Sequence, residues 1–187
     1  MTPRLLVAGV GNIFLADDAF GPEVIRALED RPLPPGVRVR DYGIRGMDLA
    51  YDLLDGYPTA VLVDAAPRGL PPGTLSLIEA ELPDGTVVPE AHGMDPAKVL
   101  ALATHLGDEP LPRVLVLACE PAVLPGGDDL LPGLSAPVRE AVGRAVDALH
   151  ALAPALLADP AGPVPPLGRP VESGPPSTAA LPGTAPG

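Results

Sequence analysis

The stretch from Leu5 to Leu28, LLVAGVGNIFLADDAFGPEVIRAL, constrains the fold more than any other part of the chain. It opens with an apolar run that predicts a buried strand, and the glycines within and after this run predict a turn. Apolar residues then recur at helical spacing behind two adjacent acids, Asp17 and Asp18. The stretch therefore predicts a strand, a glycine turn and a helix, with two carboxylates at the junction.

These adjacent acids have two interpretations. Carboxylates stabilise a helix N-terminus through its exposed N–H groups and its dipole. The same position, just past the carboxyl end of a first parallel strand, is also where open α/β sheets place their chemistry. The stretch alone does not separate a capping role from a functional one.

Strands and helices continue to alternate along the rest of the chain. With a first strand at residues 4–9, short apolar or β-branched runs predict further strands over 37–41, 60–64, 74–78 and 113–119. Periodic segments predict helices over 18–29, 47–54, 96–106 and 137–152. This alternation predicts an α/β fold: a three-layer α/β/α sandwich with a mostly parallel five-stranded sheet.

The chain of 187 residues is long enough for one domain with a sizeable core. Its character changes from residue 158 onward, because the last 30 residues hold nine prolines and five glycines with almost no periodicity. Such a segment does not bury enough apolar surface to offset the entropy lost on ordering. We therefore predict an α/β domain over residues 1–157 and a disordered Pro/Gly-rich tail over residues 158–187.

Charge and composition exclude several classes of partner. The formal net charge of −12 argues against nucleic acid and anionic membranes. The sequence shows neither a signal peptide nor a run of about 18 apolar residues for a membrane span. Cys119 is the single cysteine, which excludes an internal disulfide and fits a reducing compartment. We expect a cytoplasmic monomer that binds neither nucleic acid nor membrane.

Acidic residues also end or follow later strands, at Asp41, Asp64 and Glu120. The carboxyl ends of parallel strands meet at one edge of a sheet, and His92 lies in the loop before a helix that returns to that edge. A histidine and two carboxylates from separate loops form a three-ligand site with open positions, and this ligand set suits Zn, Ni or Fe. Each residue also has a structural interpretation, because a strand-end Asp can close a turn and a loop His is commonly solvated.

A dinucleotide-binding fold is the competing interpretation of the opening stretch. Gly9 and Gly11 follow a strand, and Asp41 stands where a ribose-binding acid would lie. Phe14, however, replaces the third glycine of that motif. Two acids at the helix N-terminus would also repel the pyrophosphate that this position normally attracts. A nucleotide-binding α/β domain is therefore the less favoured alternative.

Four sequence blocks follow one another between Leu5 and Leu152. They are Gly9-x-Gly11-Asn12 with Asp17-Asp18 and Gly21, then Asp41-Tyr42-Gly43-Ile44-Arg45-Gly46-Met47, then Val61-Leu62-Val63-Asp64-Ala65, and finally His92-Gly93-Met94-Asp95. Together these blocks resemble the NiFe-hydrogenase maturation proteases. The resemblance implies a hydrolase, an endopeptidase that removes the C-terminal extension of a NiFe-hydrogenase large-subunit precursor once nickel has been inserted.

The resemblance also implies which residues form the site. Three residues match the positions that contact the metal and carry catalysis in the family: Asp18, Asp64 and His92. The implied metal is the nickel of the precursor, with zinc as a surrogate. A further segment matches a loop associated with substrate recognition, through Asp41, Gly43 and Gly46. Within it, Ile44 stands where some members have a small hydroxyl residue, so the loop does not specify which hydrogenase is served.

The sequence leaves three mechanisms of peptide-bond hydrolysis open. In the first, the three residues grip nickel already held by the precursor, and water attacks a nearby peptide bond. In the second, they hold a metal of their own that lowers the pKa of bound water. In the third, of the aspartic type, Asp17 or Asp18 acts as a general base. A non-catalytic nickel-binding maturation chaperone with the same ligands is the alternative from a different class.

Overall fold

The computed structural model describes residues 2–82, 95–126 and 129–167. Its strands are β1 (Leu5–Val10), β2 (Val37–Gly43), β3 (Thr59–Ala65), β4 (Leu75–Glu79) and β5 (Arg113–Cys119). Its helices are α1 (Phe20–Asp30), α2 (Gly46–Leu53), α3 (Pro96–Leu106) and α4 (Ala136–Ala158), with a 3₁₀ turn η1 (Ala16–Ala19) before α1. The strand order is β2-β1-β3-β5-β4, and only β4 runs antiparallel to its neighbour. The predicted mostly parallel five-stranded sheet is confirmed.

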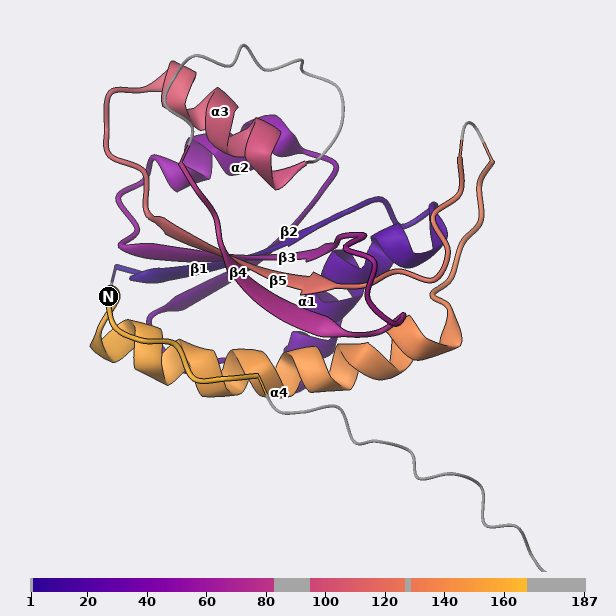
Figure 1. Ribbon diagram of the computed structural model, residues 1–187. Coiled ribbons are helices and arrows are strands. Elements are labelled where there is room, and N and C mark those ends of the chain that lie inside the picture. Colours follow the sequence, from indigo (N-terminus) through magenta and orange to yellow (C-terminus); the bar gives the residue numbers. More distant parts are fainter. Residues whose placement is uncertain (1, 83–94, 127–128, 168–187) are drawn as a thin grey trace, which may run out of the picture.

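Helices cover both faces of this sheet, as Figure 1 shows. α1 and α4 pack together on one face, and α2 and α3 pack together on the other. Successive side chains of a strand point to opposite faces, so Val7 of β1 joins the core under α1 and α4, and Leu6 and Ala8 join the core under α2 and α3. β3 is buried along its whole length, as expected for a central parallel strand. The three-layer α/β/α sandwich is therefore confirmed.

The first helix begins later than the sequence predicts. α1 begins at Phe20, after η1, whereas the periodicity placed its start at Asp18. The carboxylates of Asp17 and Asp18 do not cap the helix, because both accept hydrogen bonds from backbone amides that lie outside it. The capping interpretation of the adjacent acids is therefore wrong.

α4 extends to Ala158, beyond the end predicted near residue 152. Pro154 lies inside the helix, where a proline removes one backbone hydrogen bond. The helix continues through it because Leu152, Ala153 and Leu156 are buried in the core under α1 and α4. Burial of the apolar face thus outweighs the local cost of the proline.

Within the described residues, α4 is also the one helix long and apolar enough to cross a membrane, with a mean hydropathy of 1.3. The core helix of a water-soluble domain meets the same criteria of length and composition. Because one face of α4 is buried against the sheet, this finding is weak evidence for a membrane span.

The residues that follow α4 lie against the domain. The Arg113 guanidinium, at the start of β5, donates to the carbonyl oxygens of Pro160 and Gly162 at 3.1 and 2.8 Å. The side chains of Val164 and Leu167 pack against the core under α1 and α4. Residues 158–167, which the composition assigned to a disordered tail, are therefore packed on the domain, and residues 168–187 lie outside the described residues.

These contacts predict that a truncation after Asp159 destabilises the protein. The loss of the carbonyl acceptors of Arg113 and of two partly buried side chains should cost about 2 kcal/mol, or a fall in melting temperature of about 4–8 °C. A truncation after Leu167 is the matched control, and it should leave the melting temperature unchanged because the composition of residues 168–187 predicts disorder. Equal melting temperatures for both truncations would contradict this account of residues 160–167.

Candidate active site

Acidic residues gather at the edge of the sheet where the parallel strands end. Asp18 lies in η1 just after β1, Asp41 and Asp64 lie near the ends of β2 and β3, and Glu120 follows β5. The turn after β1 passes beside the end of β2, because the Gly11 N–H donates to the Gly43 carbonyl oxygen at 3.0 Å. The acids that the sequence predicted at the carboxyl edge of the sheet therefore lie at that edge in the structure.

Two glycines allow η1 and α1 to lie close against this edge. A Cβ on Gly21, in the first turn of α1, would collide with the carbonyl oxygens of Val10 and Val63, at the ends of β1 and β3. Gly11 has a φ of +135°, which other residues rarely adopt, and a Cβ there would collide with the Asp18 carbonyl oxygen. The absence of side chains at these positions therefore lets η1, which carries Asp18, contact β3.

Asp18 is held by the turn that follows β1. Its Oδ2 accepts a hydrogen bond from the Asn12 N–H at 2.8 Å. Burial raises the pKa of this carboxyl above its ordinary value, and the bond from Asn12 offsets part of the effect. The side chain is thus fixed in position but has a less stable anion than an exposed aspartate.

Asp64 is 6% exposed and lies beside Ala118 of β5. Burial raises its pKa to about 8, the negative charge of Asp18 adds to the shift, and the Ala65 N–H opposes it. The structure therefore brings Asp18 and Asp64 close enough for their charges to repel, and we refer to these two residues as the carboxyl pair. A cation bound between them would favour their ionised forms.

The third predicted ligand, His92, lies outside the described residues. Asp95, three positions later in the sequence, is the N-cap of α3, and its Oδ1 accepts a hydrogen bond from the Ala97 N–H at 2.9 Å. Its charge also contributes to the raised pKa of Asp64, so the N-terminus of α3 faces the same edge. Over residues 2–82, 95–126 and 129–167, no group of three or more His, Cys, Asp or Glu side chains could hold a metal ion. The three-ligand site stays a prediction.

Asp17 differs from its neighbour Asp18 in both burial and bonding. Its fully buried carboxylate accepts hydrogen bonds from the N–H groups of Ala122, Val123 and Ser135 and from the Ser135 hydroxyl, at 2.7 to 2.9 Å. Burial raises the pKa of Asp17, but these hydrogen bonds outweigh it and hold the pKa below its ordinary value. Because its oxygens are committed to these donors, Asp17 is not the general base that the sequence left open.

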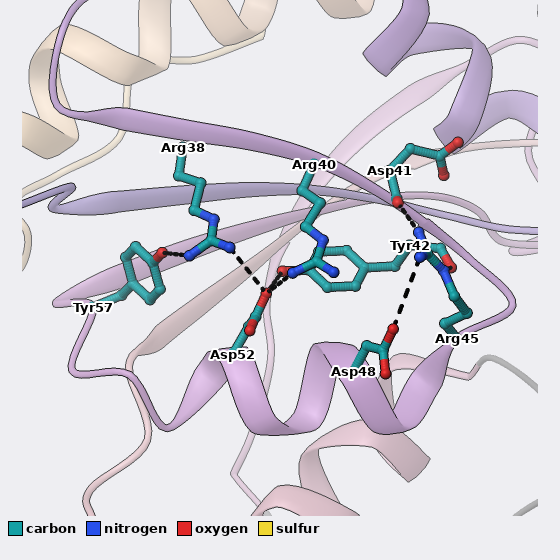
Figure 2. Close-up of polar contacts among 8 residues, drawn as sticks. All are labelled: Arg38, Arg40, Asp41, Tyr42, Arg45, Asp48, Asp52 and Tyr57. Carbon is teal, nitrogen blue, oxygen red and sulfur yellow. Dashed lines mark hydrogen bonds and ion pairs between the residues drawn. The ribbon is translucent and has the colours of Figure 1, made fainter.

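The predicted substrate-recognition loop is braced against the turn after β1. The Asp41 carboxylate accepts a hydrogen bond from the Gly43 N–H at 2.8 Å, and the Gly43 carbonyl oxygen accepts the bond from Gly11 described above. Gly43 has a φ of +55°, and Gly46 begins α2. The Arg45 guanidinium donates to the Asp41 carbonyl oxygen (Figure 2). The loop is therefore bonded to the same turn whose Asn12 N–H binds Asp18.

A polar network that the sequence did not reveal joins β2 to α2 (Figure 2). Asp52 of α2 accepts hydrogen bonds from the Tyr42 hydroxyl at 2.5 Å and from the Arg40 guanidinium at 2.7 Å. The Arg40 guanidinium also lies over the Tyr42 ring, at 4.9 Å from its centroid. Arg38 donates to the Tyr57 hydroxyl at 3.2 Å. This network anchors the base of the recognition loop on α2, and it lacks a local sequence signal because its members come from separate elements.

The end of β5 supplies structural groups. The buried Glu120 carboxylate accepts hydrogen bonds from the N–H groups of Arg68 and Gly69, at 2.7 and 3.2 Å, and so fixes the loop after β3. Cys119 is buried, and burial raises the pKa of its thiol to about 12. A thiol with this pKa is a poor nucleophile at neutral pH. We therefore assign neither Glu120 nor Cys119 a catalytic or metal-binding role.

The fold and this edge define a class of protein: a doubly covered α/β sheet with one buried and one half-buried carboxyl group, which repel each other, at the carboxyl ends of its parallel strands. A sequence profile described as hydrogenase maturation protease matches residues 22–151. The chain is 33% identical over 174 residues to the hydrogenase expression/formation protein HupD of Rhizobium leguminosarum bv. viciae, covering 88% of this chain and 84% of that protein. It is 34% identical over 148 residues to a putative hydrogenase maturation protease of Methanocaldococcus jannaschii, covering 76% and 92%.

Solved structures show the same likeness. The hydrogenase maturating endopeptidase HybD from E. coli superimposes with a TM-score of 0.64 at 29% identity, covering 83% of this chain and 93% of that one. A hydrogenase 2 maturation peptidase from Thaumarchaeota archaeon gives a TM-score of 0.57 at 32% identity, covering 83% and 97%. The chain belongs to the hydrogenase maturation protease family, which confirms the resemblance drawn from its four sequence blocks. It is a hydrolase, an endopeptidase of hydrogenase maturation.

The close approach at Gly21 makes a direct prediction. Gly21→Ala should destabilise the protein by at least about 2 kcal/mol, because its Cβ meets backbone atoms that cannot move aside cheaply. Gly143→Ala in α4 is the matched control, since a Cβ there meets no atom within 4 Å. This control should gain about 0.5–1 kcal/mol from helix propensity. Chemical denaturation measures both changes, and a Gly21→Ala protein as stable as the wild type would contradict the packing described.

The carboxyl pair predicts a pH-dependent stability for the metal-free protein. The pKa of Asp64 is raised from 3.8 in an unfolded chain to about 8 in the fold, so its contribution to stability is full below about pH 4 and is lost as the pH rises to about 8. Asp64→Asn, which carries no charge, should therefore melt several degrees above the wild type at pH 8 and close to it at pH 4. Thermal melts in a chelator test this, and a difference that is the same at both pH values would contradict it.

Proposed function

We propose that this protein removes the C-terminal extension of a NiFe-hydrogenase large-subunit precursor after nickel has been inserted, and that Asp18, Asp64 and His92 contact the nickel of that precursor. Membership of the hydrogenase maturation protease family supports the reaction class. The four sequence blocks support the assignment of the three residues. The nickel belongs to the substrate and is not a resident cofactor of this protein.

One observation carries the proposal: at the edge of the sheet the half-buried Asp18 lies close enough to the buried Asp64 for their negative charges to repel. Without a cation, the pKa of Asp64 is raised to about 8 by burial and by Asp18. A nickel-loaded precursor would supply the missing positive charge, whereas an empty precursor would not. The electrostatic gain on docking is therefore larger for the loaded precursor, and this difference acts as a proofreading step.

Hydrolysis then adds one water across the scissile peptide bond, with the hydroxyl going to the carbonyl carbon and the proton to the leaving nitrogen. Of the two adjacent acids considered as a general base, Asp17 is fully buried and its carboxylate already accepts four hydrogen bonds. Asp18 lies at the edge, close enough to Asp64 for its charge to raise the pKa of Asp64. We assign two roles to Asp18: it contacts the nickel, and it acts as the general base that accepts the proton of the attacking water.

The same proposal places the protein in the cytoplasm as a monomer that binds neither nucleic acid nor membrane. The net charge of −12 and the single, buried thiol of Cys119 support this. Its protein partner is the large-subunit precursor, and zinc is expected to replace nickel only as a surrogate.

The test is incubation with a purified precursor, with and without nickel, followed by mass measurement of the precursor. We expect wild-type protein to shorten the loaded precursor and to leave the empty one intact. His92→Ala and Asp64→Asn should each slow trimming by at least about 100-fold, the scale on which loss of a metal contact acts. Asp55→Asn is the charge-matched control and should trim normally. Asp55 is exposed and follows the C-terminal end of α2, whereas α2 begins at the edge where the parallel strands end.

Two outcomes would contradict the proposal in different ways. Nickel binding by wild-type protein without any shortened precursor would indicate the non-catalytic maturation chaperone. Trimming by His92→Ala at the wild-type rate would show that the three-residue assignment is wrong, while leaving the reaction itself in place.

A further inference from the structure

We infer that Asp17 is a positioning residue: its carboxylate fastens the connection between β5 and α4 to the segment that carries Asp18, and so preforms the surface on which the precursor docks. The inference rests on the proposed function and deepens it. It concerns a residue that the mechanism does not use, since Asp17 is fully buried and cannot touch substrate.

The bonding of Asp17 joins parts of the chain that are far apart in sequence. Its Oδ2 accepts hydrogen bonds from the N–H groups of Ala122 and Val123, both at 2.8 Å, near the start of the connection. Its Oδ1 accepts a bond from the Ser135 N–H at 2.7 Å, at the end of the connection. One carboxylate thus holds both ends of the connection where they leave β5 and enter α4.

Because Ser135 bonds to Asp17, helix α4 lacks a side-chain N-cap bond. It is the N-cap residue of α4, a position where serine normally bonds an amide of its own helix. Here the side chain makes no capping bond, and its hydroxyl donates instead to Asp17 at 2.9 Å. The bond to Asp17 has therefore displaced the usual helix cap.

Backbone contacts extend the join on either side of Asp17. The Asp17 N–H donates to the Val123 carbonyl oxygen at 3.2 Å, and the Ala16 N–H donates to the Leu131 carbonyl oxygen at 2.5 Å. In return, the Leu131 N–H donates to the Phe14 carbonyl oxygen at 2.9 Å. Four residues of the connection, at positions 122, 123, 131 and 135, are therefore hydrogen-bonded to residues 14–17.

The joined segments carry exposed apolar side chains, which we call the docking rim: Ile13, Phe14, Val123, Leu124, Leu130 and Leu131. Figure 1 shows the connection after β5 projecting beyond the edge of the sheet. Exposed apolar side chains on adjoining segments are typical of a surface that binds another protein. The rim continues directly into η1 and Asp18, so a precursor whose nickel reaches the carboxyl pair would cover it. We assign an apolar stretch of the precursor as its occupant.

If Asp17 acts in this way, weakening its bonds lowers the fraction of molecules whose rim is ready to bind. Apparent affinity for the precursor falls by that fraction, while the carboxyl pair is unaltered in the bound complex. The expected signature is a raised KM with an unchanged kcat. A purely structural role would lower the melting temperature and leave both constants unchanged for the folded molecules.

The experiment uses Ser135→Ala, which removes one donor and leaves the other three. We expect KM for trimming of the nickel-loaded precursor to rise about three- to tenfold, the net effect of one typical intramolecular hydrogen bond, with kcat within about twofold of wild type. Hydrogen exchange at the Ala122 and Val123 amides should become faster. Ser135→Thr, which keeps the hydroxyl, should restore both values. Asp17→Asn should have a larger effect in the same direction, provided that it folds.

Several outcomes would overturn the inference. A lower melting temperature with unchanged KM and kcat would make Asp17 merely structural, and a fall in kcat alone would mean that it acts on Asp18 and not on docking. If Ser135→Ala leaves hydrogen exchange at the Ala122 and Val123 amides unchanged, Asp17 does not hold the connection in the way inferred. Wild-type protein that leaves loaded precursor uncut would overturn the proposed function instead, and precursor binding affinity would then replace KM as the measurement.

Discussion

The candidate site depends on how closely the start of α1 approaches the ends of β1 and β3. Gly21 permits this approach, because any side chain there would collide with carbonyl oxygens of Val10 and Val63. Gly11 permits the turn that leads into it. This close approach brings η1 into contact with β3 and Asp18 near Asp64. The two carboxyl groups therefore repel each other, which helps to raise the pKa of Asp64. A longer separation would leave two ordinary surface acids.

Two acids that are adjacent in the sequence have opposite electrostatic states. Asp17 points into a set of hydrogen-bond donors, which hold its pKa below the ordinary value. Asp18 points toward the edge, where burial raises its pKa. The first is suited to hold a loop, and the second to meet a cation. Residue type and position therefore do not assign a role to either acid, because the role is set by which donors and charges surround the side chain.

The sequence predicted the sheet and its helices well because apolar strands, glycine turns and helical periodicity are local signals. It also predicted that Asp18 and Asp64 meet, since the carboxyl ends of parallel strands share an edge. It did not predict the role of Asp17, because the donors of Ala122, Val123 and Ser135 lie more than a hundred positions away. It failed likewise for residues 159–167, where composition indicated disorder and packing against the core outweighed it.

The central claim is that Asp18 and Asp64 distinguish a nickel-loaded precursor from an empty one. The most direct measurement is the dissociation constant of the protein for each form of the precursor, determined for the wild type and for Asp64→Asn. Wild-type protein should bind the loaded form more tightly, and Asp64→Asn should lose most of that preference while still binding the empty form. An equal preference in both proteins would contradict the claim.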